Sequence, residues 1–199
     1  MEEIRINSKI SYIKASANPL SADIGIIKTC GNTWLYDVGS GEKSISGLNG
    51  SYNVVLSHFH KDHAGNIDRI RAKALYVSKE TYRHVRRGIV VSSDIYTDGL
   101  RIFPLPSSHA KGCLGLEVDE TYAFVGDALY CRPKGGLYVY NTQLLKEEIE
   151  ALSRLKASWL LASHFEGLVR EKDKVIDELK AIYAKRDINS PYIRVSFES

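Results

Sequence analysis

Residues 52–66, YNVVLSHFHKDHAGN, place four potential metal ligands directly after a short apolar run. The run, Val54 to Leu56, predicts a buried strand. The ligands that follow it are His58, His60, Asp62 and His63. His58 and His60 are one residue apart, so their side chains converge only where the chain is extended, at the end of a strand or in the loop that leaves it. Asp62 alone could be a helix N-cap, but three histidines and one aspartate in six residues are typical of a metal site.

Three later segments repeat this arrangement, in which an apolar strand is followed at once by a potential ligand. They are FPLPSS before His109, VG before Asp127, and LLAS before His164. Strand ends at one edge of a rigid frame bring residues that are distant in sequence together. Seven ligands exceed what one tetrahedral zinc ion uses, so the pattern predicts two metal ions that share a carboxylate.

Composition predicts one globular domain over residues 1–199. The chain is 44% hydrophobic and 26% charged, which suits a core of at least two layers. No apolar run approaches the roughly 18 residues that span a bilayer, and the N-terminus has no signal-peptide core. We therefore expect a cytoplasmic protein that does not enter a membrane. Three widely spaced cysteines without a C-x-x-C pair argue against a disulfide framework or a zinc knuckle.

The net charge of +3 is small, but the basic residues are unevenly distributed. Residues 69–87 contain seven Lys or Arg and a single acid, Glu80. A solvated surface is the favoured interpretation of this segment. The alternative is a patch that attracts an anionic substrate.

The order of the expected elements indicates two sheets with helices packed outside them. Gly31-Asn32 is a hairpin signal, and Ser78 and Asn141 or Thr142 are expected helix N-caps. Residues 128–140 are expected to form a loop, and a helix-like stretch is expected over 64–70. The expected strands are 9–16, 23–30, 33–36, 52–57, 73–77, 100–105, 115–118, 121–125, 159–162 and 192–197, and the longer helices are 78–88, one that begins at 141–142, and 171–185.

With these motifs the chain resembles the metallo-β-lactamase superfamily of hydrolases over nearly its whole length. The His-x-His-x-Asp-His motif of that family stands here at residues 58–63. The resemblance implies an α/β (α+β) fold, a four-layer αββα sandwich with the metals at one edge of the two sheets. It also implies which residues hold each ion: His58, His60 and His109 the first, Asp62, His63 and His164 the second, with Asp127 as the bridge.

Within the superfamily, the complete His and Asp set is most similar to the glyoxalase II branch. Common β-lactamases have a cysteine where Asp127 stands, and flavodiiron oxidoreductases have a glutamate where His60 stands. The resemblance implies a hydrolase with two divalent ions, zinc first and iron or manganese as alternatives. A hydroxide that bridges them would cleave a small ester or thioester, and Asp62 would orient it as the catalytic residue. Lys134 and Tyr138 are the candidate residues for binding a small anionic substrate.

Three other functions are compatible with the same residues. The first is a phosphodiesterase or nuclease, although no interleaved aromatic and basic platform is evident, so nucleic acid is the less favoured partner. The second is a mononuclear iron enzyme resembling the persulfide dioxygenases, which would use His58, His109 and Asp127. The third is a non-catalytic module that keeps its metal for stability. The sequence leaves the oligomeric state open.

Overall fold

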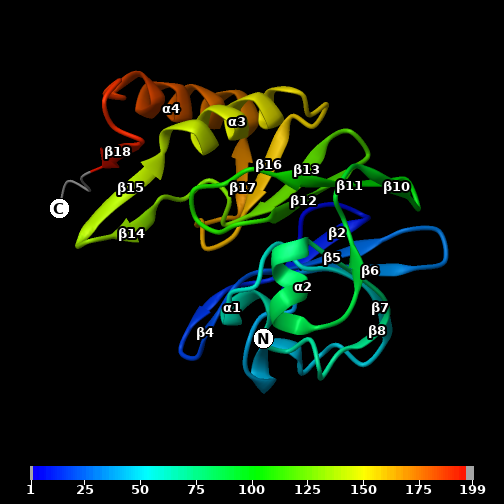
Figure 1. Cartoon of the computed structure of the whole chain (residues 1–199). Coiled ribbons are helices and arrows are strands. Elements are labelled where there is room, and N and C mark those ends of the chain that lie inside the picture. Colours follow the sequence, from blue (N-terminus) through cyan, green and yellow to red (C-terminus); the bar gives the residue numbers. More distant parts are fainter. Residues whose placement is uncertain (1, 196–199) are drawn as a thin grey trace.

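Two large β-sheets form the centre of the molecule (Figure 1). The computed structural model describes residues 2–195. The first sheet contains, in spatial order, β1 (Glu3–Arg5), β2 (Ile10–Ile13), β5 (Ile24–Lys28), β6 (Thr33–Tyr36), β7 (Ser51–Val55), β8 (Arg71–Val77) and β9 (Ile89–Val90). The second contains β10 (Ile95–Thr97), β11 (Leu100–Leu105), β12 (Cys113–Val118), β13 (Tyr122–Gly126), β16 (Trp159–Ala162) and β17 (Val169–Glu171).

The remaining elements cover these sheets or extend from them. A small third sheet contains β14 (Arg132–Lys134), β15 (Leu137–Asn141) and β18 (Tyr192–Val195), and a two-stranded ribbon contains β3 (Ser16–Ala17) and β4 (Leu20–Ser21). The helices are α1 (Lys61–Ala64), α2 (Lys79–Val85), α3 (Thr142–Ser153), α4 (Lys172–Ala184) and the 3-10 turn η1 (Glu42–Ile45).

Alternation along the strands builds three apolar layers. In β6, Trp34 and Tyr36 enter the core between the two sheets, whereas Leu35 enters the core on the outer side of the first sheet. In β13, Phe124 faces the central core and Val125 faces the core beneath α3 and α4. This assignment of neighbouring residues to opposite faces follows from the two-residue period of a strand.

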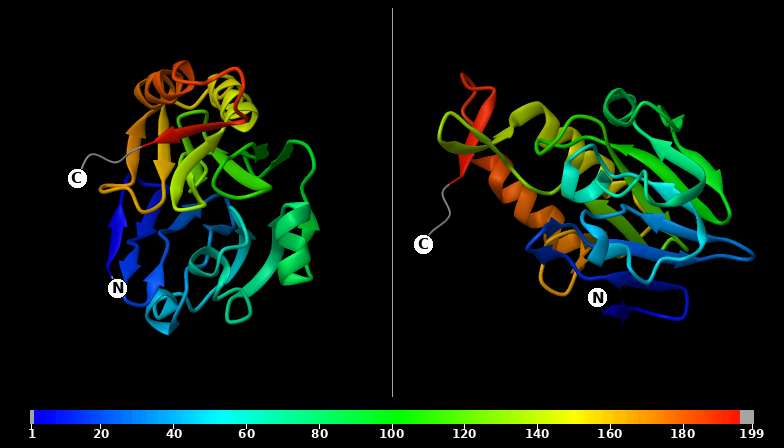
Figure 2. Two further views of the ribbon diagram at one scale, coloured as in Figure 1. Left: turned by 60° about the vertical axis from the view of Figure 1, so that its left-hand side comes forward. Right: turned by 90° about the horizontal axis from the view of Figure 1, so that it is seen from below.

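Helices close both outer faces. Leu145 and Leu152 of α3 and Val175 of α4 pack on the second sheet, and Ala64 of α1 packs on the first. Figure 2 shows α3 and α4 on the side of the second sheet that faces away from the first. The predicted four-layer αββα arrangement is therefore confirmed. No helix within residues 2–195 is long and apolar enough to span a bilayer.

Parallel strand pairs explain why the ligand segments meet. β6, β7 and β8 pair in parallel in the first sheet, and β13 pairs in parallel with β16 in the second. The carboxyl ends of parallel neighbours lie at the same sheet edge. Asp37 and His58 follow β6 and β7, and Asp127 and His164 follow β13 and β16.

Two local predictions were wrong. The helix expected over 64–70 instead spans Lys61–Ala64, with the extended residue His60 at its N-cap position, and gives way to turns from Gly65. The loop expected over 128–140 contains the β14–β15 hairpin, whose turn uses Gly135 and Gly136 at positive φ. The last predicted strand begins at Tyr192 as expected, and its end at 196–197 lies outside the described residues.

Candidate metal centre

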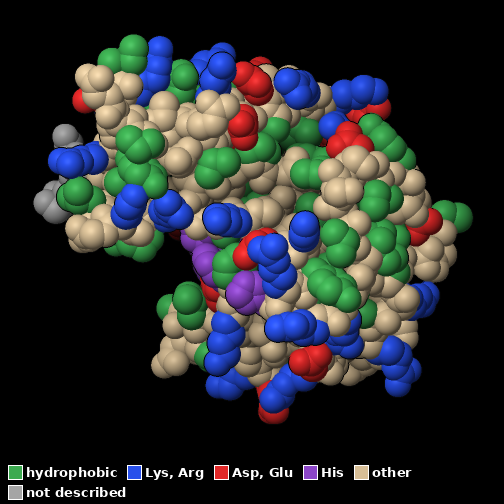
Figure 3. All heavy atoms as spheres, in the orientation of Figure 1, with side chains coloured by type: hydrophobic (Ala, Val, Ile, Leu, Met, Phe, Trp, Pro, Cys, Tyr) green, Lys and Arg blue, Asp and Glu red, His purple; other side chains and the backbone are tan. Residues whose placement is uncertain are grey.

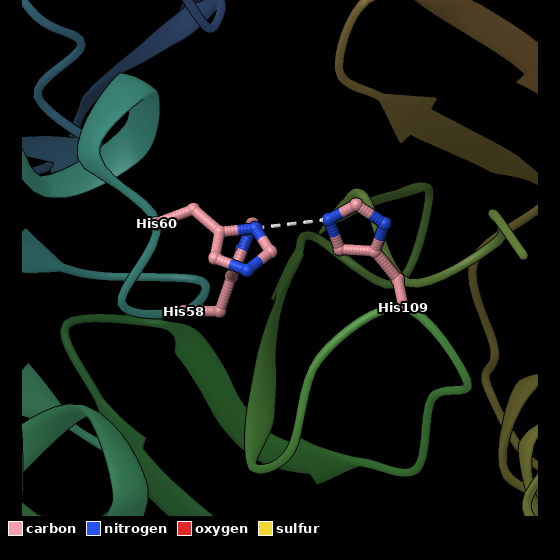
Figure 4. A group of neighbouring side chains, drawn as sticks. All are labelled: His58, His60 and His109. Carbon is pink, nitrogen blue, oxygen red and sulfur yellow. Dashed lines mark hydrogen bonds between the residues drawn. The ribbon is translucent and has the colours of Figure 1, made fainter. Parts of the chain in front are cut away.

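Three histidines from two sheets converge at the first group of potential ligands. His58 follows β7, His60 precedes α1, and His109 lies in the loop between β11 and β12. Nε2 of His58 is 2.9 Å from Nδ1 of His60, which is 3.1 Å from Nε2 of His109. Figure 4 shows the three rings directed toward one another. Nitrogens bound to one tetrahedral zinc ion lie roughly 3.3 Å apart, given bonds of about 2.0–2.1 Å, so these three are close to a ligand arrangement.

The second group combines two carboxylates with two histidines: Asp62, His63, Asp127 and His164. Nε2 of His164 is 3.1 Å from Oδ2 of Asp62, and Nε2 of His63 is 3.6 Å from the same oxygen. Their ligand atoms all lie within 4.8 Å of one another. This group has the ligand number and chemistry of a second cation site.

Asp127 lies between the two groups. Its Oδ2 is 3.3 Å from Nε2 of His63 in the second group and 3.4 Å from Nε2 of His109 in the first. It also reaches His164, at 3.9 Å. This is the position that a bridging carboxylate requires.

Unpaired buried atoms indicate that the residues fit metal ions. Nε2 of His63 and Oδ1 of Asp127 are buried and have no hydrogen-bond partner within residues 2–195. Buried polar atoms are normally paired, so a bound cation would supply the missing partner. Imidazole nitrogens with carboxylate oxygens suit zinc, iron or manganese, and the set does not select one of them.

Local electrostatics also favour cation binding. Burial, followed by the neighbouring histidines, lowers the pKa of His58, so its imidazole stays neutral and can coordinate. Burial alone lowers the pKa of His63, but Asp37 and Asp127 outweigh it and raise the pKa to about 10. Burial raises the pKa of Asp62, but the hydrogen bond from His164 and the charge of His63 together lower it to about 2. The carboxylate of Asp62 thus remains charged and attracts a cation.

Asp37 and Ser57 orient two of the histidines, a role that the sequence pattern did not predict for them. Oδ2 of the fully buried Asp37 is 2.7 Å from Nδ1 of His63. The Ser57 hydroxyl donates to the same oxygen at 2.7 Å and lies 3.0 Å from Nδ1 of His58. A carboxylate on the outer nitrogen of a ligand histidine fixes its tautomer and orientation. The available signal was the position of Asp37 directly after the apolar strand 33–36.

Asp23 has a similar role for His164. Its Oδ2 accepts a hydrogen bond from the backbone N–H of His164 at 2.9 Å, and its Oδ1 accepts one from Ala15. His164 has a φ of 61°, an uncommon conformation for a residue other than glycine. Asp23 therefore stabilises the backbone turn that directs His164 toward Asp62. Nothing in the local sequence around Asp23 distinguishes it from a turn aspartate.

The residues predicted to bind substrate lie on the β14–β15 hairpin. Lys134 pairs in register with Leu137, and Tyr138 pairs with Pro133. Because side chains alternate along a strand, Lys134 and Tyr138 point to opposite faces of the small sheet. Their roles, and that of Asp62 in catalysis, stay predictions. Figure 3 shows histidines in a hollow at one side of the molecule, with Lys and Arg side chains around its margin.

Comparison with known proteins identifies the fold. No protein-family model matches the sequence, and a search of curated proteins gives no match either. Solved structures do match over nearly the whole chain. The DIM-1 metallo-β-lactamase is 15% identical, with a TM-score of 0.70, over 92% of this chain and 96% of that one.

Two further matches are not described as β-lactamases. An archaeal metallo-β-lactamase superfamily protein from Sulfolobus tokodaii is 20% identical, with a TM-score of 0.61, over 96% of this chain and 91% of that one. The chemotaxis sensor ODP, in a peroxy-diiron state, is 15% identical, with a TM-score of 0.66, over 92% of this chain and 94% of that one. The chain therefore has the metallo-β-lactamase fold, with His and Asp groups at its sheet edge that can bind metal. The narrower resemblance to glyoxalase II stays a prediction.

Proposed function

We propose that this protein is a metal-dependent hydrolase that cleaves a small ester or thioester carrying an anionic group. The observation that supports this most directly is the shared position of Asp127, whose Oδ2 lies 3.3 Å from one ligand group and 3.4 Å from the other. A purely structural zinc site is completed by four protein ligands. Seven ligands divided over two adjacent sites leave positions for water and substrate.

The chain's own residues would hold the ions and manage the proton. His58, His60 and His109 would hold one ion, Asp62, His63 and His164 the other, with Asp127 shared. Divalent ions in such a site supply hydroxide at neutral pH and polarise the scissile oxygen. Asp62 is only partly buried and stays ionised, so it can accept a hydrogen bond from the attacking water and orient it.

Cationic residues near the hollow support an anionic substrate, and the basic segment 69–87 is partly neutralised. In residues 69–87, Arg69, Arg83 and Arg87 pair with Glu42, Glu80 and Asp68. These carboxylates neutralise part of that charge. Lys134 on β14 instead lies over the ring of Tyr192, with Nζ 3.4 Å from the centroid. We therefore assign attraction of the substrate to the β14–β15 side of the hollow.

Metal analysis and a small substrate panel test this function. Purified protein should contain about two zinc, iron or manganese ions per chain, as two adjacent sites require. The panel is S-lactoylglutathione, a simple thioester, bis-p-nitrophenyl phosphate and a β-lactam. We expect thioester turnover that is lost in Asp62→Ala and retained in Asp68→Ala, which removes an exposed carboxylate that pairs with Arg87.

Three experimental outcomes would contradict the proposal, the second of which uses glutathione persulfide as an additional substrate. Phosphodiester turnover alone would favour a phosphodiesterase. A single iron per chain with oxygen consumption on glutathione persulfide would favour a dioxygenase. Protein that stays metal-free after reconstitution would exclude metal-dependent hydrolysis.

A further inference from the structure

The small sheet β14–β15–β18 has one basic face and one face in the core. Arg132 and Arg194 flank Val139 in register on its two sides, and Tyr192 pairs with Asn141. Because side chains two residues apart share a face, Lys134 lies on the side of Arg132, and Tyr192 on the side of Arg194. We call the residues Arg132, Lys134, Tyr192 and Arg194 the basic face. Tyr140 and Ile193 point the other way, into the core beneath α3 and α4.

Two of the three cations of the basic face lie against the ring of Tyr192. Nζ of Lys134 is 3.4 Å from the centroid of its ring, and Cζ of Arg132 is 5.9 Å from it. A hydrogen bond from Lys134, followed by its charge, lowers the pKa of the Tyr192 hydroxyl. Cations over an aromatic face are held without a carboxylate, so their charge is not cancelled.

The basic face has no acidic partner in the described part of the chain. β14, β15 and β18 contain no Asp or Glu. Within residues 2–195, no carboxylate forms an ion pair with Arg132, Lys134 or Arg194. Three like charges on one surface repel one another, and an anionic ligand would relieve that repulsion.

The basic face lies next to the metal centre along the chain, because Tyr130, close to the candidate ligands, is followed by Arg132. Tyr130, two residues before Arg132, donates a hydrogen bond to the carbonyl of Ser163 at 2.7 Å, next to the ligand His164. Its ring centroid is 6.5 Å from that of His109. In Figure 3, Lys and Arg side chains border the hollow on the side where Figure 1 shows the β14–β15 hairpin. A substrate bound at the metal centre can therefore extend along the basic face.

We propose that the basic face binds the phosphate groups of a thioester substrate whose thiol part is phosphorylated, as coenzyme A is. Arginine presents a planar fork that binds phosphate through paired hydrogen bonds, and lysine adds a point charge. A substrate with a single carboxylate would pair with one cation of the basic face, whereas a substrate with several phosphates can pair with all three. This inference rests on the proposed thioester hydrolysis and identifies its substrate class.

The reaction is hydrolysis and needs no further reactant. The oxygen of water forms a bond to the acyl carbon, and the carbon–sulfur bond breaks with its electron pair on sulfur. Sulfur takes up one proton from the water. The products are a carboxylate, the free thiol and one proton.

Binding to the metal-free protein separates recognition from catalysis. We would titrate coenzyme A and pantetheine, which lacks the phosphates, by calorimetry. Coenzyme A should bind more tightly than pantetheine, and this difference should shrink with salt. Arg132→Gln with Arg194→Gln should weaken coenzyme A binding about tenfold or more, since hydrogen bonds to charged groups are lost. Lys73→Gln, an exposed lysine on β8 in the first sheet, should leave it unchanged.

Equal affinity for the two ligands would overturn the inference. So would tighter binding of a short single-stranded DNA through the same arginines, which would indicate nucleic acid as the partner.

Turnover by the metal-loaded protein completes the test. We would compare acetyl, lactoyl and benzoyl thioesters of coenzyme A with the same acyl groups on pantetheine. We expect a higher kcat/KM for the coenzyme A thioesters, and loss of this preference in the double arginine variant while pantetheine thioesters are still cleaved. Equal kcat/KM for both series would refute this inference but leave the hydrolase intact. If no thioester is cleaved, this inference fails, and if no simple ester is cleaved either, the proposed function fails with it.

Discussion

At the scale of single residues, the candidate metal centre depends on side chains outside its two ligand groups. Asp37 holds Nδ1 of His63, Ser57 contacts both His58 and His63, and Asp23 holds the backbone of His164. Each is buried. Their hydrogen bonds fix the directions of the ligand rings, so part of the metal affinity resides in them.

Asp37→Asn tests this support. The amide keeps the size of the side chain but removes the charge beside His63, so metal affinity should fall about 10- to 100-fold. Competition with a chromogenic chelator measures it directly. Asp68→Asn, at an exposed carboxylate, serves as the control. Unchanged affinity in Asp37→Asn would mean that His63 is oriented by other contacts.

Glu148 on α3 provides a second prediction, unrelated to metal. Its carboxyl group is fully buried, and neither oxygen has a hydrogen-bond partner within residues 2–195. Burial raises its pKa well above the usual range, so the folded state holds a proton that the unfolded state releases near pH 4.5. Stability should therefore fall as the pH rises above that value, by about 1.4 kcal/mol per pH unit until the folded group ionises.

Glu148→Met should remove this loss. We expect the free energy of unfolding to rise by about 1–3 kcal/mol at pH 8 and by less at pH 5. The reason is that ionisation of Glu148 stabilises the unfolded wild-type chain more at the higher pH. Urea unfolding at the two pH values measures the difference. Glu150→Met, on the exposed side of the same helix, should change stability by less than about 0.5 kcal/mol. A pH-independent effect of Glu148→Met would contradict the predicted protonation.

At the scale of elements, strand ends and one helix position the two ligand groups. The turn after β13 needs Gly126, which has a φ of 55° and lies where a Cβ would be 2.8 Å from Cβ of Ser57. Helix α2 and its N-cap residue lie against both loops that carry the histidines of the first group. His84 stacks on Phe59, between His58 and His60, and a Cβ at Gly112, in the loop after His109, would be 2.8 Å from Oγ of Ser78.

Gly126→Ala should disturb the candidate metal centre by more than backbone strain alone would cause. Alanine at positive φ costs about 1–2 kcal/mol by itself, and its methyl group would also displace Ser57 and Asp127. Gly135→Ala is the matched control, because its φ is 58° and nothing lies within 4 Å of the added Cβ. Denaturant unfolding and chelator competition should show a larger stability loss in Gly126→Ala, and a loss of metal affinity in that variant alone. Equal losses would show that packing at Gly126 is irrelevant.

His84→Ala tests the contact of α2 with the ligand loop. The rings of His84 and Phe59 are 4.1 Å apart and nearly parallel, at 8°. Loss of this stack should cost about 0.5–1.5 kcal/mol and loosen the first ligand group, which visible spectra of the cobalt-substituted protein would report. His84→Phe should restore both. If the spectra of His84→Ala match those of the wild type, α2 has no part in positioning the ligands.

At the scale of the whole molecule, the candidate metal centre combines residues from the two large sheets. His58, His60, Asp62 and His63 come from the first, and His109, Asp127 and His164 come from the second. The central core already joins the sheets through residues such as Trp34 and Phe124. A metal held by both halves would add a cross-link at the edge where this apolar core ends.

Metal addition should therefore stabilise the fold. A ligand that binds only the folded state adds about 2.7 kcal/mol at a hundredfold excess over its dissociation constant. Thermal unfolding with and without zinc should show a higher Tm with zinc and one cooperative transition in both states. Asp127→Ala removes the shared carboxylate and should lose most of the increase. An unchanged Tm on adding zinc to metal-free wild-type protein would mean that the folded state does not bind it.

The candidate ligands and the architecture follow from local patterns in the sequence. Each segment that carries candidate ligands follows an apolar strand, and strand alternation and helix caps such as Ser78 and Asn141 depend on neighbouring residues. Contacts between distant segments, by contrast, depend on how the whole chain folds. Asp37 resembles a turn aspartate until β6 and β7 pair in parallel and bring it to His63, 26 residues away. The basic face arises only when β18 pairs with β15 and places Arg194 across from Arg132, since a strand's partner is set by the packing of the whole core and not by its own residues.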